Sequence, residues 1–172
     1  MKKKLGLYLL VLVLAMSLLA GCSKSKDTGG TSDADVIKIG VFEPMTGAQA
    51  AGGEMTVEGI KLANEIKGEV LGKKVELVIV DNKSDKVEAA NAVSRLIEKE
   101  NVAAIIGSYS SSLAMSAGDI VKQKEVPAVG CSPTNPLVTL NNDYYFRVCF
   151  IDPFQGTVMA NYAFKDLGAR KA

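Results

Sequence analysis

Histidine is absent from this chain of 172 residues. Its absence removes the usual general base at neutral pH, the commonest zinc ligand, and any Ser-His or Cys-His catalytic pair. A serine hydrolase would then need a Ser-Lys pair, and the sequence lacks the Gly-x-Ser-x-Gly motif. The formal net charge is only +1, which argues against a nucleic-acid partner.

The sequence also lacks the glycine pattern of a dinucleotide-dependent enzyme. Gly47, Gly52 and Gly53 do not form Gly-x-Gly-x-x-Gly, and Asp81 comes much later than the roughly 20 residues that this pattern requires. We interpret Asp81 as a turn or helix-entry residue. The acidic residues are scattered, without metal-ligand spacing, so we expect no enzymatic activity, no cofactor and no metal.

A long apolar run is present at the amino terminus. Lys2, Lys3 and Lys4 precede an apolar segment, residues 5–20, that ends at Leu19-Ala20-Gly21-Cys22. A basic start, an apolar core of about 15 residues and a small-residue exit are typical of an export signal, whereas a membrane-spanning helix needs about 20. An uncleaved anchor helix is the alternative.

The sequence Leu-Ala-Gly-Cys resembles the lipobox of bacterial lipoproteins. This resemblance implies that residues 1–21 are a lipoprotein signal peptide and that Cys22 is the lipid attachment site. The protein would then lie outside the cytoplasm, anchored to the cell membrane. Residues 22–35 contain no large apolar side chain and are predicted to be a flexible tether.

From residue 36 onward, short β-branched runs alternate with amphipathic segments. We expect five strands, at residues 36–42, 74–80, 102–106, 128–130 and 144–148. Helices are expected at residues 54–67, 85–99, 112–124 and 154–168. Asp85 and Glu88 have the spacing of a capping box at the start of the second helix. The alternation predicts an α/β fold with a doubly wound parallel sheet, a Rossmann-like lobe.

Apolar spacing predicts which helix faces are buried. The expected core positions are Ile60, Ala63 and Ile66 in the first helix; Val87, Ala90, Val93 and Ile97 in the second; and Leu113, Ala117, Ile120 and Val121 in the third.

Hydroxyl groups cluster where ligands bind in such sheets, beyond the carboxyl ends of the strands. Ser110, Ser111 and Ser112 follow the third predicted strand and open the third helix, whose positive dipole end favours a small anion. The alternative is that one serine merely caps the helix. Three hydroxyls exceed that need.

A second loop, residues 130–136, follows the fourth predicted strand and would stand beside the serines. It contributes Ser132 and Thr134, and its two prolines restrict the backbone and lower the ordering cost of binding. An ordinary proline-rich turn is the alternative. A third loop, residues 43–53, is small and flexible enough to admit a ligand near the first strand.

From residue 38 to residue 167, the chain resembles the leucine/isoleucine/valine-binding branch of the type I periplasmic-binding-protein family. Individual phrases are weakly specific, but their order and spacing together are strong. They are Pro44-Met45-Thr46-Gly47, Gly72-Lys73-Lys74-Val75-Glu76-Leu77, Ile105-Ile106-Gly107, Ser110-Ser111-Ser112, Ser132-Pro133-Thr134-Asn135-Pro136, Tyr145-Phe146-Arg147 and Phe154-Gln155-Gly156.

The resemblance implies roles for individual residues. Ser111 and Thr134 would bind the α-carboxylate of an amino acid through hydroxyl and amide groups, and the Ser132 carbonyl would accept from its ammonium group. Ala51 departs from the family, which usually places an aromatic side chain there against the ligand. The pocket wall is therefore smaller, and the preferred amino acid is left open.

The resemblance also implies an architecture of two lobes. Residues 36–150 would form the amino-terminal lobe, and residues 151–172 the crossover and first helix of a second lobe that is largely missing. We therefore expect half a cleft and weak amino-acid binding. The implied partners are an amino acid ligand and the permease subunits of an ABC importer. A ligand-sensing domain of a membrane receptor with the same fold is the alternative.

Two cysteines follow the predicted strands. An exported location permits a disulfide between Cys131 and Cys149, and two free, buried cysteines are the alternative.

Overall fold

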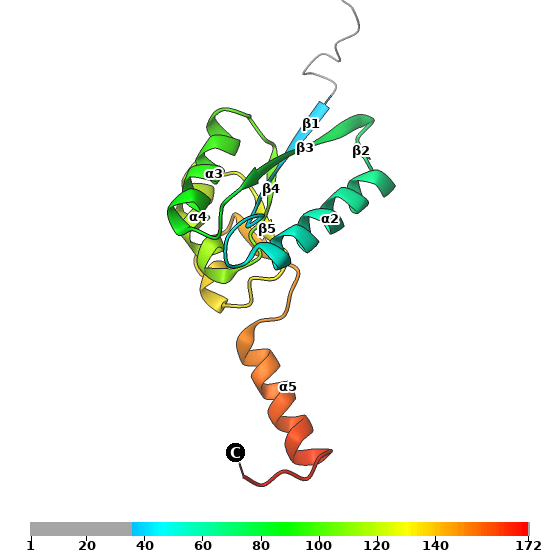
Figure 1. Ribbon diagram of the computed structural model, residues 1–172, viewed down its shortest axis with the longest axis vertical. Coiled ribbons are helices and arrows are strands. Elements are labelled where there is room, and N and C mark those ends of the chain that lie inside the picture. Colours follow the sequence, from blue (N-terminus) through cyan, green and yellow to red (C-terminus); the bar gives the residue numbers. More distant parts are fainter. Residues whose placement is uncertain (1–35, 172) are drawn as a thin grey trace, which may run out of the picture. The chain divides into compact units, whose positions relative to one another are not determined.

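The computed structural model describes residues 36–171 (Figure 1). The predicted signal peptide, Cys22 and the tether lie outside the described residues. The described elements, in chain order, are β1 (Val36–Glu43), α2 (Ala50–Ile66), β2 (Glu69–Val70), β3 (Lys73–Asp81), α3 (Lys86–Glu98), β4 (Ala104–Gly107), α4 (Ser111–Lys124), β5 (Ala128–Gly130), the 3-10 helix η2 (Pro136–Val138), β6 (Tyr145–Arg147) and α5 (Asp152–Lys165).

These strands form a six-stranded sheet in the order β2-β3-β1-β4-β5-β6. β1 pairs in parallel with both β3 and β4, and β4, β5 and β6 continue the parallel pairing. In Figure 1, α3 and α4 cover one face of the sheet and α2 covers the other. The predicted α/β fold with a doubly wound parallel sheet is therefore confirmed.

The short antiparallel strand β2 was not predicted. It joins β3 through a tight turn in which Leu71 and Gly72 both have positive φ, of 54° and 75°. Two positive φ values match the type I′ turn, whose twist suits a hairpin. Because β2 has two residues, both exposed, it carries no apolar alternation that could reveal it in the sequence.

Two apolar clusters hold the helices against the sheet. The larger one lies under α3 and α4 and joins Phe42 of β1 to Val93, Leu96, Leu113 and Val121. The smaller one joins Val41 of β1 to Val57 and Ile60 of α2. Because successive strand residues point to opposite faces, neighbouring Val41 and Phe42 serve different clusters.

The predicted buried face is correct for α4 and partly wrong for α3 and α2. In α3 the buried residues are Ala89, Ala92, Val93 and Leu96, whereas Val87 is 67% exposed because it lies in the first turn. In α2, Ile60 is buried but Ile66 is 78% exposed. The carboxyl half of α2 lies over an apolar hollow of about 770 Å³ between the helix and the sheet instead of a filled core.

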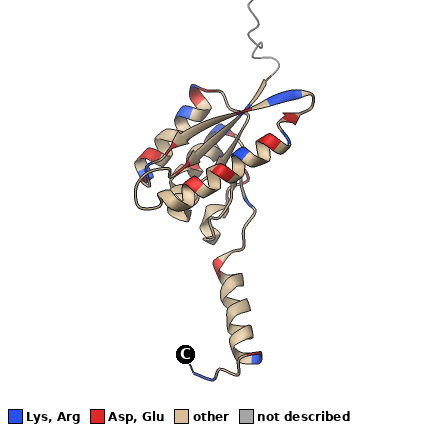
Figure 2. Cartoon of the chain, turned by 45° about the vertical axis from the view of Figure 1, so that its right-hand side comes forward, with Lys and Arg blue, Asp and Glu red and all other residues tan. Residues whose placement is uncertain are grey.

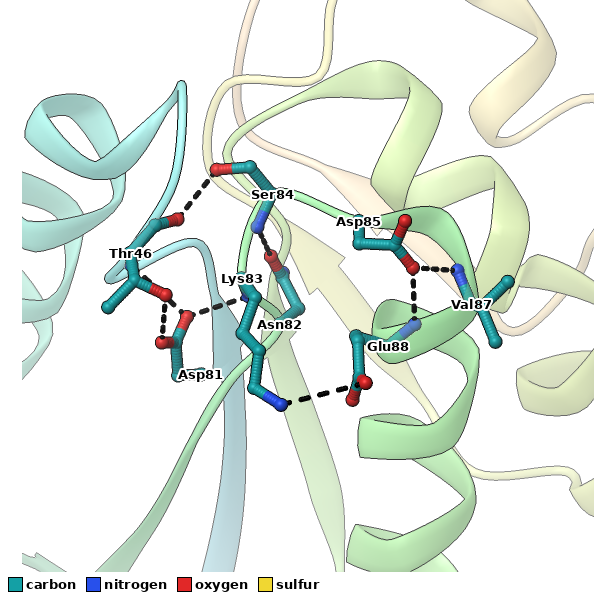
Figure 3. A network of polar contacts seen from close by, with 8 residues as sticks. All are labelled: Thr46, Asp81, Asn82, Lys83, Ser84, Asp85, Val87 and Glu88. Atoms are coloured by element: carbon teal, nitrogen blue, oxygen red, sulfur yellow. Dashed lines mark hydrogen bonds and ion pairs between the residues drawn. The ribbon is translucent and has the colours of Figure 1, made fainter.

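Half of the predicted capping box is present at the start of α3 (Figure 3). The Asp85 carboxylate accepts from the amides of Val87, at 2.8 Å, and Glu88, at 3.0 Å. The reciprocal bond is replaced, because the Asp85 amide donates to the Asn82 carbonyl and Glu88 pairs with Lys83 at 3.6 Å.

Helix α5 buries none of its residues. In Figure 2, the residues coloured as charged lie near the two ends of α5, with a long uncharged stretch between them. Phe154, Met159, Tyr162 and Phe164 are among its exposed apolar side chains. None of the helices between residues 36 and 171 has the length and apolar content that a membrane crossing requires.

Replacing Leu96 should destabilise the lobe strongly. Leu96 is fully buried, and its side chain packs on the backbone of β1 at Gly40. We expect Leu96→Ala to lower the free energy of unfolding by about 2–5 kcal/mol, because it removes buried methyl groups and leaves a cavity. The matched control is Leu62→Ala, since Leu62 is 56% exposed. Equal losses in urea denaturation would contradict the assigned core.

Candidate ligand-binding site

Four loops leave the same edge of the sheet. Parallel pairing aligns Glu43 with Asp81 and Phe42 with Gly107, so the loops after β1, β3 and β4 begin at one level. The loop after β5 begins beside β4 at the same edge. The six residues predicted to bind ligand lie on three of these loops or on the first turns of the helices that follow them.

The serine run forms the start of α4. Ser110 occupies the N-cap position, but its side chain makes no capping hydrogen bond. Its hydroxyl instead lies 3.1 Å from the Ser112 hydroxyl. The Ser111 hydroxyl accepts from the Asn135 amide at 3.1 Å, which ties α4 to the loop after β5. Simple helix capping therefore does not explain the serines, and the first amides of α4 receive no acceptor from Ser110.

The loop after β5 is bonded to the serine loop. The Ser132 hydroxyl donates to the Tyr109 carbonyl at 3.0 Å. The Thr134 carbonyl accepts from the Asp152 amide at 3.0 Å, and no hydrogen bond engages the Thr134 hydroxyl within residues 36–171. The Thr134 hydroxyl thus remains available beside the start of α4.

Arg147 fixes the backbone of the same loop. Its guanidinium donates to the carbonyls of Pro133 at 2.9 Å, Asn135 at 2.7 Å and Pro136 at 3.1 Å. The prolines alone were expected to make this loop rigid, and no role was predicted for Arg147. A guanidinium is suited to the task because its donors are held in a planar fork.

Asp81 joins the loops after β1 and β3 (Figure 3). Its carboxylate accepts from the Met45 amide at 2.9 Å, the Lys83 amide at 2.8 Å, and the Thr46 amide and hydroxyl at 3.2 and 2.6 Å. Asp81 is the last residue of β3 and not a turn or helix-entry residue, but its side chain binds the turn that follows and also holds a second loop.

The same hydrogen bonds keep Asp81 charged. Partial burial acts to raise its pKa, but the bonds from the Thr46 hydroxyl and the Lys83, Met45 and Thr46 amides outweigh that effect and lower the pKa below its ordinary value. Ser84 adds a second link, because its hydroxyl donates to the Thr46 carbonyl at 2.7 Å and accepts from the Gln49 amide at 3.0 Å.

Tyr109 lies against the first turn of α2. A Cβ atom at Gly52 would come within 2.3 Å of the Tyr109 ring, and one at Gly53 within 2.0 Å of the Pro44 carbonyl oxygen. Only glycine at positions 52 and 53 therefore allows the Tyr109 ring and the Pro44 carbonyl to lie this close to the helix backbone. Ala51, the predicted wall residue, is exposed beside this contact. The Tyr109 ring is an aromatic surface at the site that the sequence analysis did not identify.

Glu43 is a buried carboxyl group at the end of β1. One oxygen, Oε2, accepts from the Tyr109 amide at 2.6 Å. Burial raises the pKa of Glu43 to about 8, although hydrogen bonds from Tyr109 and Ser108 act to lower it. In the sequence, Glu43 is only a polar residue directly after the predicted strand 36–42, and this position could not have identified its role.

Both cysteines of the described region are free and partly buried. Burial, the nearby charge of Glu43 and the neighbouring Cys149 raise the pKa of the Cys131 thiol to about 11. The Cys149 thiol donates to the Pro133 carbonyl at 3.4 Å. The structure thus matches the alternative of free cysteines. Within residues 36–171, no group of three or more acidic or cysteine side chains is placed to hold a metal ion.

Residues 36–172 match the model of the periplasmic binding protein family. The chain belongs to this family. Because the family consists of binding proteins, the prediction that the chain is not an enzyme is confirmed. The periplasmic binding protein assignment also agrees with the location of the site at the carboxyl edge of a parallel sheet.

Curated relatives include an amino acid binding protein from Pseudomonas aeruginosa, 32% identical over 165 residues, and Leu/Ile/Val-binding protein homolog 2 from Brucella abortus, 32% identical over 138 residues. These alignments cover 94% and 78% of this chain but 42% and 37% of the relatives. The chain therefore spans about two fifths of the length of the curated relatives it matches.

Solved structures agree on the fold. A leucine binding protein from Thermotoga maritima is 51% identical with a TM-score of 0.74, and the match covers 77% of this chain and 38% of that one. A branched-chain amino acid transporter substrate binding protein from Streptococcus pneumoniae, in complex with isoleucine, is 34% identical with a TM-score of 0.73, covering 78% and 39%.

A third solved structure was determined with a different ligand. It is a solute binding protein of an ABC transporter from R. palustris in complex with 4-hydroxybenzoate. The identity is 32% and the TM-score 0.71, and the match covers 79% of this chain and 37% of that one.

The buried position of Glu43 predicts a pH-dependent stability. In the unfolded chain its pKa returns to about 4.5, so between pH 4.5 and 8 the folded state holds a proton that the unfolded state lacks. The free energy of unfolding should therefore fall as pH rises through this window, by on the order of a few kcal/mol. Urea denaturation at both ends of the window measures this fall. If the free energy of unfolding of a Glu43→Gln variant fell as much between pH 4.5 and 8 as that of the wild type, Glu43 would not be the group responsible.

Proposed function

We propose that this chain is the ligand-binding lobe of an extracytoplasmic, lipid-anchored solute-binding protein. It captures an amino acid, branched-chain or related, for delivery to the permease subunits of an ABC importer. The observation that carries the proposal is the start of α4, where three serine hydroxyls follow one another and the Ser110 side chain caps none of the first helix amides.

This arrangement suits a carboxylate. The amino end of a helix carries a partial positive charge and donors without intrahelical acceptors. Ser111 lies at that end, and the free hydroxyl of Thr134 lies on the adjoining loop, held there by the bond between Asn135 and Ser111. A carboxylate bound here exchanges water for donors that are already in position, so little ordering cost remains.

An amino acid also needs an acceptor for its ammonium group. The proposed acceptor is the Ser132 carbonyl, in the loop that Arg147 holds in place through the neighbouring Pro133 carbonyl. Two similar proteins support a carboxylate-bearing ligand, because one was solved with isoleucine and another with 4-hydroxybenzoate. The 51% identity to a leucine binding protein favours the amino acid over the aromatic acid.

The Tyr109 ring and Ala51 would form the wall beside the ligand side chain. Ala51 leaves space at the first turn of α2, and the Tyr109 ring covers Gly52 next to it. An apolar ligand side chain would gain burial against this ring at about 25 cal/mol per Å² of apolar area removed from water. Delivery to permease subunits and closure by a second lobe belong to the proposal for the whole protein.

A serine substitution tests the carboxylate site. We expect Ser111→Ala to weaken isoleucine binding by roughly ten- to a hundredfold, since a hydrogen bond to a charged group contributes about 1.5–3 kcal/mol. Chemical-shift titration of backbone amides suits the weak affinity expected of one lobe. Ser94→Ala in α3 is the matched control and should bind as the wild type does. Unchanged affinity in Ser111→Ala would contradict the site.

A cysteine substitution tests the lipid anchor, which is proposed from the Leu-Ala-Gly-Cys sequence alone. In a bacterial host that processes lipoproteins, Cys22→Ala should remove the mass of the lipid. Cys131→Ala is the matched control and should keep that mass. A Cys22→Ala variant that still carries the lipid would refute lipid attachment at Cys22.

A further inference from the structure

Glu43 has a feature that the proposed site does not use. Its side chain is fully buried, and its Oε1 atom has no hydrogen-bond partner among the described residues. Leaving a buried polar atom unpaired is costly, and leaving a buried charge unpaired costs more. A carboxyl group at this position therefore destabilises the folded state. We infer that its ability to bind and release a proton has a function that offsets this cost.

The neighbours of Glu43 hold the backbone around its hydrogen bond to the Tyr109 amide. The Asn82 amide group donates to the Ser108 hydroxyl at 3.1 Å, and the Tyr145 hydroxyl donates to the Gly107 carbonyl at 2.6 Å. These contacts fix the two residues that precede Tyr109. Glu43 then fixes Tyr109 itself, two residues before Ser111 in the proposed carboxylate site.

Glu43 is the group in this cluster that titrates near neutral pH. The charge of Glu43 acts on two other titratable groups, Tyr145 of β6 and Cys131 after β5, and burial raises the pKa of each well above neutral. Asp81, its register partner on β3, stays charged because its pKa is lowered. Arg147 is occupied by carbonyls of the loop after β5.

We propose that Glu43 is a positioning residue of the ligand site, which holds the Tyr109 backbone as a neutral acid and weakens anion capture when it ionises. A negative charge on Glu43, which bonds to the Tyr109 amide just before α4, would repel the negatively charged carboxylate of the ligand. By linkage, a bound carboxylate also favours the protonated form of Glu43. This inference rests on the proposed function.

The first test needs no ligand. In the wild-type chain, the Tyr109 amide resonance should shift between about pH 6 and about pH 9 with a single inflection, because its acceptor gains a charge. The inflection should vanish in Glu43→Gln and persist in Glu98→Gln, a matched control at an exposed glutamate of α3. A Tyr109 resonance that stays constant in the wild type would overturn the proposal, whether or not the variant folds.

The second test uses isoleucine as the probe. We expect wild-type affinity to fall roughly three- to tenfold from about pH 6 to about pH 9, and the affinity of Glu43→Gln to stay nearly constant. A parallel fall in both proteins would overturn the role of Glu43. If the wild type bound neither isoleucine nor 4-hydroxybenzoate at any pH, the proposed function would fail, while the Tyr109 titration would still decide whether Glu43 controls this loop.

Discussion

The parallel pairing of β1 with β3 and β4 is the constraint on which the site depends. It places Glu43, Asp81 and Gly107 at one edge of the sheet, so that loops far apart in sequence begin side by side. A one-residue slip of β1 would exchange Val41 and Phe42 between the two apolar clusters, which makes the register costly to change. Core packing therefore fixes the geometry of the loops as well as the stability of the lobe.

Side-chain contacts to the backbone then hold the loops in one conformation. Asp81 joins the first two loops, Ser111 and Ser132 join the last two, and Arg147 stiffens the loop after β5. Most of these contacts end on amides or carbonyls, so they restrict the chain without demanding a particular neighbouring side chain. A site held this way loses little conformational entropy when a ligand binds. Within residues 36–171, none of these contacts engages the Thr134 hydroxyl.

The parallel strands and the hydroxyl-rich loops that follow them could be predicted from the sequence because their signals are local. Periodicity located β1, α4 and β5, and the hydroxyls of Ser110–Ser112 and Ser132 stood out by composition. The bonds between Asp81 and Thr46 and the contact between Tyr109 and Gly52 could not be predicted, because each joins residues that are 35 or more positions apart in the sequence. Val87 was wrongly predicted to be buried for another reason. Apolar spacing alone does not show at which residue a helix first contacts the sheet.

The position of isoleucine in a crystal structure of the complex would test the proposed site most directly. We expect its carboxylate within hydrogen-bond distance of the Ser111 and Thr134 amides, with its side chain against the Tyr109 ring. Isoleucine lying instead in the apolar hollow between α2 and the sheet, away from the start of α4, would contradict it.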